Sequence, residues 1–345
     1  MSGVRVAVVG ATGAVGTTML RLLKEREFPA DEIVPFASER SAGLQIDGLT
    51  VRALGPDTDL DGFDVALFSA GSGVSREWAP QFVEHGAVVV DNSSCWRMEP
   101  DVPLVVAEVN PEMIPQHRGI IANPNCTAMQ ALPVLKPIHD AAGLERLVLS
   151  SYQSTSGTGA RAVEELKDQA HAILHEMEPP PPAIYPHPIA FNVLPQVETF
   201  KDGDDYTTEE RKVIAECRKI LGLPALRITA TCVRVPVMNC HSESWNIETH
   251  DELSPSDCRA VLASAPGVVV VDDPGAGRYP LASEVSGRDE VFVGRIRRDE
   301  SNPRTLNMWV VGDNLRKGAA TNAIQIAELL AAGEVSAAQP ARAAY

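Results

Sequence analysis

Near the start of the chain stands Val6-Ala7-Val8-Val9-Gly10-Ala11-Thr12-Gly13-Ala14-Val15-Gly16, an apolar run that leads directly into three spaced glycines. An apolar helical pattern follows it, with Met19, Leu22 and Leu23. Strand, glycine turn and helix in this order form the pyrophosphate site of dinucleotide-binding domains, because the helix N-terminus presents N–H groups to an anion. The spacing is G-x-x-G-x-x-G rather than the usual G-x-G-x-x-G, so a tight turn without a ligand remains an alternative.

The first 125 residues alternate short β-rich runs with helical stretches, a pattern typical of a parallel α/β sheet. From about residue 146 the runs become longer and more polar, which predicts a mixed or antiparallel second sheet. We therefore expect an α/β protein with an N-terminal Rossmann-type dinucleotide-binding domain (1–125 with the C-terminal segment 314–345) and a second, α+β domain with a mixed or antiparallel sheet (126–313). The expected strands are 5–9, 33–37, 65–69, 88–91, 120–122, 146–152, 226–235, 244–249, 291–297 and 307–312, and the expected helices are 16–24, 75–85, 160–176 and 319–332.

Two segments carry other signals. The proline-rich stretch 179–195 is excluded from regular helix and central strand, so we expect an extended loop or a subunit contact there. The alanine-rich tail after Gly333 is typical of a frayed terminus.

Bulk properties limit the partners. A net charge of −16 argues against nucleic acid or an anionic membrane as the main partner, because such surfaces attract clustered Lys and Arg. An apolar strand begins within a few residues of Met1, which leaves no room for a signal peptide, and no apolar run approaches the roughly 20 residues of a membrane-spanning helix. The six cysteines lack metal-site spacing, so we expect no metal and reduced thiols in a cytoplasmic protein.

One cysteine stands apart. Cys126 follows the turn-forming Asn123-Pro124-Asn125 and precedes a helix-compatible stretch, 128–138, in which Pro133 is expected to bend or end the helix. A helix N-terminus favours thiolate over thiol, so Cys126 is a candidate nucleophile, whereas Cys217 and Cys232 fit packed, inert thiols. Beside a hydride carrier, such a thiolate indicates redox chemistry through a thioester.

A nucleophilic thiol needs a partner for proton transfer. His241, expected on a loop between two strands, is the candidate acid/base, with His171, His175, His187 and His250 as alternatives.

The nicotinamide type is indicated after the second expected strand. Ser38, Arg40 and Ser41 stand where an NAD site would place an acidic residue against the ribose, and a cation with two hydroxyls suits a 2′-phosphate. NADP is therefore favoured, although Glu39 lies among them and an exposed polar turn is the simpler alternative.

Five motifs, in order along nearly the whole chain, resemble those of aspartate-semialdehyde dehydrogenase: the glycine run, Asp91-Asn92-Ser93-Ser94-Cys95-Trp96-Arg97, Asn123 to Cys126, Tyr152 to Gly157, and Arg234-Val235-Pro236 followed by His241. The resemblance implies reversible, NADP-dependent reductive dephosphorylation of 4-phospho-L-aspartate to L-aspartate 4-semialdehyde by a cytoplasmic homodimer. It also implies a place in the biosynthesis of lysine (through diaminopimelate), threonine, methionine and isoleucine.

The resemblance further implies residue roles. Cys126 would be the nucleophile and His241 the acid/base, with Asn125 and Gln153 orienting the acyl group. Substrate and inorganic phosphate would be held by Arg97, Gln153, Glu209, Lys212 and Arg234, where Glu209 and Lys212 share a helix that begins near Thr207 with a capping box to Glu210. The implied cofactor contacts are Gly10, Thr12, Gly13, Ala14, Val15, Ser38, Arg40, Ser41, Ser156, Gly157 and Asn314.

Other functions remain to be distinguished. N-acetyl-γ-glutamyl-phosphate reductase and glyceraldehyde-3-phosphate dehydrogenase share thiol-based acyl phosphate chemistry, but Asn-Pro-Asn-Cys with Glu209 and Lys212 favours the aspartate substrate. A nucleotide-sensing protein without catalysis would leave Cys126 as a packed thiol.

Overall fold

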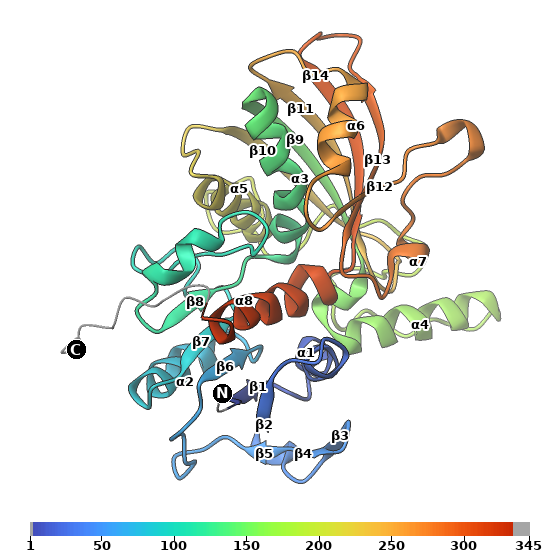
Figure 1. Cartoon of the computed structure of the whole chain (residues 1–345). Coiled ribbons are helices and arrows are strands. Elements are labelled where there is room, and N and C mark those ends of the chain that lie inside the picture. Colours follow the sequence, from blue (N-terminus) through green and yellow to red (C-terminus); the bar gives the residue numbers. More distant parts are fainter. Residues whose placement is uncertain (1–2, 334–345) are drawn as a thin grey trace. The chain divides into compact units, whose positions relative to one another are not determined.

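The computed structural model describes residues 3–333, which divide into two compact units, 3–125 with 319–333 and 126–318 (Figure 1). The first unit contains a parallel six-stranded sheet and the second a mixed six-stranded sheet. This confirms the α/β fold class predicted from the sequence. The tail after Gly333 lies outside the described residues.

The sheet of the first unit has the order β5-β2-β1-β6-β7-β8, and all its pairings are parallel. The pairing is parallel because each crossover brings the chain back to the same end of the sheet before the next strand begins. Every predicted strand of this unit is present. The strands are β1 (Val4–Val9), β2 (Ala30–Ala37), β5 (Arg52–Ala53), β6 (Val65–Phe68), β7 (Val88–Asp91) and β8 (Ile120–Ala122), and a separate hairpin pairs β3 (Gln45–Ile46) with β4 (Leu49–Thr50).

Helices cover both faces of this sheet. Because side chains alternate along β1, Val6 and Val8 pack with α1 (Ala14–Glu25) and α8 (Asn322–Ala331), whereas Ala7 and Val9 pack on the other face with α2 (Ser72–Glu84). The C-terminal helix α8 therefore belongs to the core of the first unit, where Glu328 also forms a two-bond fork with Arg26.

Two glycines of the opening run hold the chain in positions that no other residue fits. Gly10 has a positive φ of 86°, and a Cβ there would lie 2.4 Å from the carbonyl oxygen of Ser69. A Cβ on Gly16 would lie 2.1 Å from the carbonyl oxygen of Gly10. The loop can therefore turn tightly from β1 into α1, whose N-cap Gly13 has no side chain to cap the first-turn N–H groups.

The sheet of the second unit has the order β10-β9-β11-β14-β13-β12. The pairs β10–β9 and β12–β13 are parallel and the other three are antiparallel, so the sheet is mixed. Its short edge strand β12 was not predicted, whereas the other five were. The strands are β9 (Leu144–Gln153), β10 (Arg227–Arg234), β11 (His241–Thr249), β12 (Val268–Val270), β13 (Val291–Arg298) and β14 (Thr305–Gly312).

The first helix of this unit corrects one expectation. α3 (Cys126–Ala142) continues through Pro133 and Pro137, although Pro133 was expected to bend or end it. A proline removes one intrahelical hydrogen bond, but most of the residues of α3 are buried, and this packing outweighs the loss. The other helices of the second unit are α4 (Ala160–Leu174), α5 (Thr208–Leu221), α6 (Pro255–Ala263) and α7 (Ala282–Val285), and its short helical turns are η3 (Thr155–Thr158) and η4 (Pro274–Ala276). The first unit contains the turns η1 (Glu39–Ser41) and η2 (Pro111–Gln116), and the π-type η5 (Arg316–Thr321) runs from the second unit into the first.

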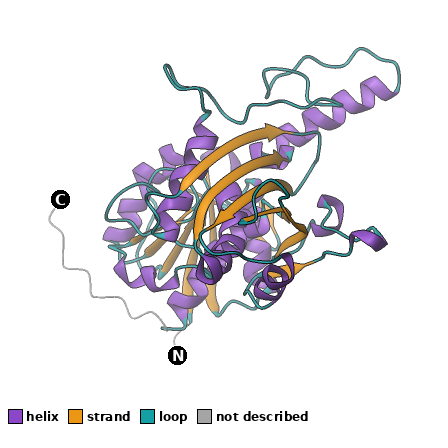
Figure 2. Cartoon of the chain, turned by 90° about the horizontal axis from the view of Figure 1, so that it is seen from above, coloured by secondary structure: helices purple, strands orange, loops and turns teal. Residues whose placement is uncertain are grey.

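Helix α4 reaches outward and ends in a long loop, 175–207, that contains the proline-rich stretch (Figures 1 and 2). The loop has no regular helix or strand, as predicted, and one isolated bridge joins Leu194 to Arg234. Apolar side chains are exposed on α4 and the loop, which leaves an uncovered apolar surface there: Ile173, Leu174, Met177, Phe191, Val193 and Phe200.

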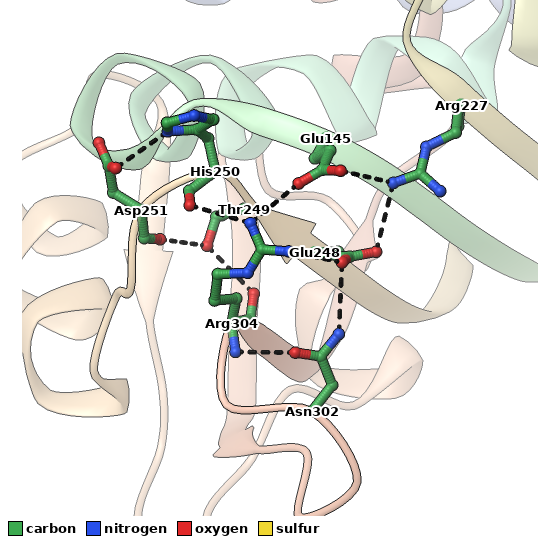
Figure 3. A network of polar contacts seen from close by, with 8 residues as sticks. All are labelled: Glu145, Arg227, Glu248, Thr249, His250, Asp251, Asn302 and Arg304. Carbon is green, nitrogen blue, oxygen red and sulfur yellow. Dashed lines mark hydrogen bonds and ion pairs between the residues drawn. The ribbon is translucent and has the colours of Figure 1, made fainter.

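Charged residues tie the strands together at one end of the second sheet (Figure 3). Glu145 on β9 and Glu248 on β11 share the guanidinium groups of Arg227 and Arg304, at N–O distances of 2.9–3.5 Å. The register places the last residues of β9 and β10 and the first residue of β11 at the opposite end of these strands. The network therefore fastens the sheet at a distance from the residues described below.

No helix in the described part of the chain is both long and apolar enough to cross a membrane.

The close approach at Gly16 makes a testable prediction. Gly16→Ala should lower the free energy of unfolding by about 1–3 kcal/mol, because its Cβ meets backbone that cannot move without shifting the loop. Gly13→Ala is the matched control, since its Cβ would lie 3.4 Å from the nearest atom, the carbonyl oxygen of Gly10, and should cost clearly less. Urea unfolding of both variants measures the difference. Equal midpoints for the two would contradict the steric argument.

Candidate active site

Cys126 is the first residue of α3, and its sulfur lies 3.3 Å from Nε2 of His241. The side chain is half-buried, and a Cβ on Gly318 would lie 3.0 Å from the Cβ of Cys126. The thiol and the imidazole proposed from the sequence are thus within contact distance in the second unit, with a glycine making room beside the sulfur.

The imidazole occupies a different local structure from the one expected. His241 is the first residue of β11 rather than part of a loop, because its backbone already pairs with Gly312 of β14. The ring is fully buried. Its Nδ1 atom accepts the backbone N–H of Ser154 at 3.1 Å, and the Ser154 hydroxyl lies 3.2 Å away.

The alternative histidines have other environments. His250 pairs with Asp251, and the rings of His171 and His175 lie 4.2 Å apart near the end of α4. His187 is exposed. Of the five candidates, His241 is the one in contact with Cys126.

Burial lowers the pKa of His241 to about 3, and the positive charge of Arg234 acts in the same direction, whereas the carbonyl of Cys240 opposes the shift. The imidazole is therefore neutral near pH 7. A neutral ring can accept a proton from the thiol, and the imidazolium that results is a strong acid, ready to return the proton.

Gln153 ends β9 and connects the thiol helix to α5. Its Nε2 donates to Thr127 Oγ1 at 2.9 Å and to Glu209 Oε1 at 3.0 Å, and Thr127 also donates to Glu209 at 3.4 Å. All three side chains are buried. These hydrogen bonds thus hold the carboxylate of Glu209 next to Thr127, the residue that follows Cys126.

Arg234 ends β10 and is 5% exposed. Nη1 donates to the carbonyl oxygen of Ser154, and the guanidinium lies 5.7 Å above the ring of Tyr185. Its Nε has no hydrogen-bond partner, and no carboxylate among residues 3–333 forms an ion pair with it. A buried guanidinium without an acidic partner is costly unless an anion occupies the space beside it.

Gly157 lies in η3, beside both groups. A Cβ there would be 3.1 Å from Cε1 of His241 and 3.3 Å from Nη1 of Arg234. Because Gly157 has no side chain, the space beside the imidazole and the guanidinium stays open.

The remaining proposed substrate residues are more dispersed. Lys212 on α5 pairs with Glu198, and the predicted capping box between Thr207 and Glu210 is confirmed at the start of that helix. Arg97 belongs to the first unit, where it is buried and donates to the carbonyl oxygen of Asn92 at 2.7 Å. Asn125, also buried, is the last residue of the first unit before Cys126.

Asn314 lies in a polar cluster of the second unit. Its Oδ1 accepts the N–H of Cys240 and the hydroxyl of Ser154, each at 3.0 Å, and lies 3.2 Å from the Ser156 oxygen. Its Nδ2 donates to Ser156 at 2.9 Å. The cluster connects η3 to the residue before His241, and Cys240 has a positive φ of 71° there.

The other proposed cofactor residues belong to the first unit. Thr12 and Gly13 are exposed in the glycine loop, and Ala14 and Val15 are the first two residues of α1. At the end of β2, Ser38 and Arg40 are exposed and Ser41 is half-buried, all in or beside η1. Glycines let the backbone come close to a ligand, and the first N–H groups of α1 have no side-chain cap. Together with the exposed Arg40, these features fit a phosphorylated dinucleotide.

The sequence reasoning missed a buried carboxyl. Glu243 lies two residues after His241 on the same face of β11 and is fully buried, with Oε2 accepting Trp245 Nε1 at 2.7 Å and Oε1 without a hydrogen-bond partner. Burial, and secondarily the charge of Glu209, raises the pKa of Glu243 to about 8. Side chains alternate along β11, which places Glu243 on the same face as His241 and Trp245. This alternation was the available signal, but a polar residue at such a position also fits a solvent-exposed face.

The six cysteines are all free, and burial raises the pKa of the Cys217 and Cys232 thiols far above the usual value, as expected for packed residues. Among residues 3–333, no group of three or more His, Cys, Asp or Glu side chains is arranged to hold a metal ion.

Comparisons with known proteins bear on the whole chain. Residues 5–117 match the model described as semialdehyde dehydrogenase, NAD binding domain, and residues 135–317 match the semialdehyde dehydrogenase, dimerisation domain. The aspartate-semialdehyde dehydrogenase of Aquifex aeolicus (strain VF5) is 54% identical over 334 residues, which cover 95% of this chain and 98% of the relative. This chain belongs to the aspartate-semialdehyde dehydrogenase family. The family predicted from the five motifs is thereby confirmed.

Other members of the family agree. The aspartate-semialdehyde dehydrogenase of Legionella pneumophila is 49% identical, over 94% of this chain and 95% of the relative. The crystal structure of aspartate semialdehyde dehydrogenase II complexed with ASA from Vibrio cholerae is 44% identical, with a TM-score of 0.91 over 96% of this chain and 98% of that chain. The Candida albicans enzyme with NADP is 26% identical, with a TM-score of 0.73 over 97% of this chain and 100% of that chain.

The buried carboxyl of Glu243 makes a prediction about stability. In the folded protein it stays protonated up to about pH 8, whereas in the unfolded chain it ionises near its ordinary pKa of 4.5, so stability falls as pH rises through this window. Glu243→Gln cannot ionise and should gain stability relative to the parent as pH rises from 5 to 8, by about 1–3 kcal/mol. Urea unfolding at both pH values measures this.

Glu164→Gln on the exposed side of α4 is the matched control and should follow the parent protein at both pH values. A gap for Glu243→Gln that stays constant with pH would contradict the protonated state of Glu243.

Proposed function

We propose that this protein is an aspartate-semialdehyde dehydrogenase that carries out the reversible, NADP-dependent reductive dephosphorylation of 4-phospho-L-aspartate to L-aspartate 4-semialdehyde. One observation supports this most directly: the buried Arg234 guanidinium, without a carboxylate partner, lies near a thiol–imidazole pair and the fixed carboxylate of Glu209. A cation and an anion on either side of a nucleophile suit an amino acid with a reactive side-chain carbonyl.

The substrate groups follow from these charges. We assign the α-carboxylate to Arg234, whose planar fork suits bidentate binding, and the α-ammonium to Glu209. Arg97 and Lys212 would bind the acyl phosphate or inorganic phosphate, and Lys212 would exchange its present partner, Glu198, for it. Gln153 and Asn125 would orient the acyl group.

The chemistry follows from the thiol and the imidazole. His241 takes the proton of Cys126, and the thiolate attacks the acyl carbon of the phosphoanhydride, so that a C–S bond forms and the C–O bond to phosphate breaks. The bound dinucleotide supplies the hydride that reduces the resulting thioester. His241 then protonates the oxyanion, and the thiohemiacetal collapses to aldehyde and free thiol. In the reverse direction inorganic phosphate is a substrate.

NADP is the proposed cofactor, and the first unit would bind it. The residues that would contact it there are Gly10, Thr12, Gly13, Ala14 and Val15 in the glycine loop and Ser38, Arg40 and Ser41 after β2. The second unit would contribute Ser156, Gly157 and Asn314. The NADP complex of the Candida albicans relative supports this choice.

The two predicted domains and the cellular context complete the proposal. We assign NADP binding to 1–125 with 314–345, and catalysis and dimerisation to 126–313; residues 314–318 themselves pack in the second compact unit, 126–318. A homodimer is supported by the match to a dimerisation domain and by the exposed apolar residues of α4 and its loop. The reaction would serve, in the cytoplasm, the synthesis of lysine through diaminopimelate, and of threonine, methionine and isoleucine.

A direct assay tests the proposal. With aspartate semialdehyde, phosphate and NADP the protein should turn over, and it should fail with N-acetylglutamate semialdehyde or glyceraldehyde 3-phosphate. Cys126→Ser should abolish turnover while NADPH binding, followed by fluorescence, stays intact, because an alkoxide is far harder to form than a thiolate. A parent-like rate in Cys126→Ser would exclude the covalent mechanism.

Cofactor choice depends on Arg40 in the proposed site. Arg40→Ala should weaken NADP binding by roughly tenfold while changing NAD binding little, because the 2′-phosphate loses a charged partner. Arg52→Ala, an arginine on the neighbouring β5 that pairs with Glu32, is the matched control. Equal losses for the two nucleotides would show that Arg40 does not read the 2′-phosphate.

A further inference from the structure

The Nδ1 atom of His241 faces both a donor and an acceptor from one residue. The backbone N–H of Ser154 points at it from 3.1 Å, and the Ser154 hydroxyl oxygen lies 3.2 Å away. If Nδ1 carries a lone pair, the N–H donates to it. If Nδ1 carries a proton, the hydroxyl oxygen accepts it, and the Ser154 N–H loses Nδ1 as its acceptor.

The neighbours of Ser154 determine where its hydroxyl proton points. The backbone N–H of Cys240 donates to Oδ1 of Asn314, which fixes the orientation of that amide. The Nδ2 of Asn314 then donates to Ser156, whose hydroxyl donates in turn to Oδ1 of Asn239. Oδ1 of Asn314 is left to accept the Ser154 hydroxyl proton at 3.0 Å, so the lone pairs of Ser154 Oγ are available to Nδ1.

The location of the imidazole proton determines what Nε2 can do. Without the Ser154 hydroxyl, the Ser154 N–H would favour a lone pair on Nδ1, and the proton of the neutral ring would sit on Nε2, facing the sulfur 3.3 Å away. A protonated Nε2 cannot accept the proton of the Cys126 thiol. A proton on Nδ1 leaves the Nε2 lone pair directed at the sulfur.

We propose that Ser154 is a positioning residue that, held by Asn314, selects the Nδ1–H tautomer of His241 and thereby enables its Nε2 to take the proton of Cys126. This rests on the proposed function, in which His241 is the base. When the thiol proton moves to Nε2, the ring becomes imidazolium and the sulfur becomes thiolate. Nδ1–H continues to donate to Ser154 Oγ, whose own proton stays on Asn314.

The surroundings of the ring make this acceptor important. In the described part of the chain, Cys126 and Arg234 are the titratable and charged side chains that act on the imidazole. Burial and Arg234 disfavour the imidazolium, and the carbonyl of Cys240 opposes them. The Ser154 oxygen is fully buried, so its lone pair replaces water that cannot reach Nδ1.

Ser154→Ala tests the assignment, because it removes the oxygen and keeps the backbone N–H. We expect kcat to fall on the order of 100-fold with KM for aspartate semialdehyde little changed, and alkylation of Cys126 by iodoacetamide to slow at pH 7. The ¹⁵N spectrum of His241, assigned by comparison with His241→Asn, should show the neutral ring protonated at Nδ1 in the parent and at Nε2 in Ser154→Ala.

Ser154→Thr keeps the hydroxyl and should retain the Nδ1–H tautomer and most of the alkylation rate. Ser286→Ala removes an exposed hydroxyl that contacts Asn239 and not the imidazole, and should behave as the parent. The same tautomer and alkylation rate in Ser154→Ala and the parent would overturn the proposal. Absence of turnover by the parent with aspartate semialdehyde would instead refute the proposed function, since the spectrum and the alkylation rate require no substrate.

Discussion

The antiparallel pairing of β9 with β11 is the constraint on which the thiol chemistry depends. Its register sets Ser242 opposite Tyr152, so that the end of β9, with Gln153 and Ser154, lies beside the start of β11 at His241. Parallel pairing of β10 with β9 aligns Arg234 with Gln153 in the same way. A shift of one residue would turn every side chain to the opposite face, so strand register and chemistry are inseparable here.

The buried ionisable groups of the second unit form an uneven set. The second unit buries an arginine without an acidic partner and a carboxyl, Glu243, without a basic one, together with the carboxylate of Glu209. In a core formed only for stability such groups would be replaced by apolar side chains, because each loses hydration without full compensation. Their presence is reasonable when part of the compensation comes from a charged ligand.

Much of this could be predicted from the sequence, and what could not has physical causes. Glycine spacing and strand alternation identified the first sheet, and Asn-Pro-Asn identified Cys126, because these are local signals. Pro133 was expected to bend or end helix α3 because a proline rule is local, whereas the packing that lets the helix continue to Ala142 is tertiary. Ser154 was missed because its contact with His241 joins segments far apart in the chain, and Glu243 was missed because its burial is a property of the folded sheet. Neither residue type is distinctive alone.

The apolar side chains exposed on α4 and its loop have a consequence for handling the protein. If a second subunit covers them, association and folding are linked, and the midpoint of thermal unfolding rises with protein concentration. Dilution would then expose these side chains and favour aggregation before any loss of the thiol pair, which lies within a single unit. Activity lost on dilution would thus report on the oligomer and not on the catalytic residues.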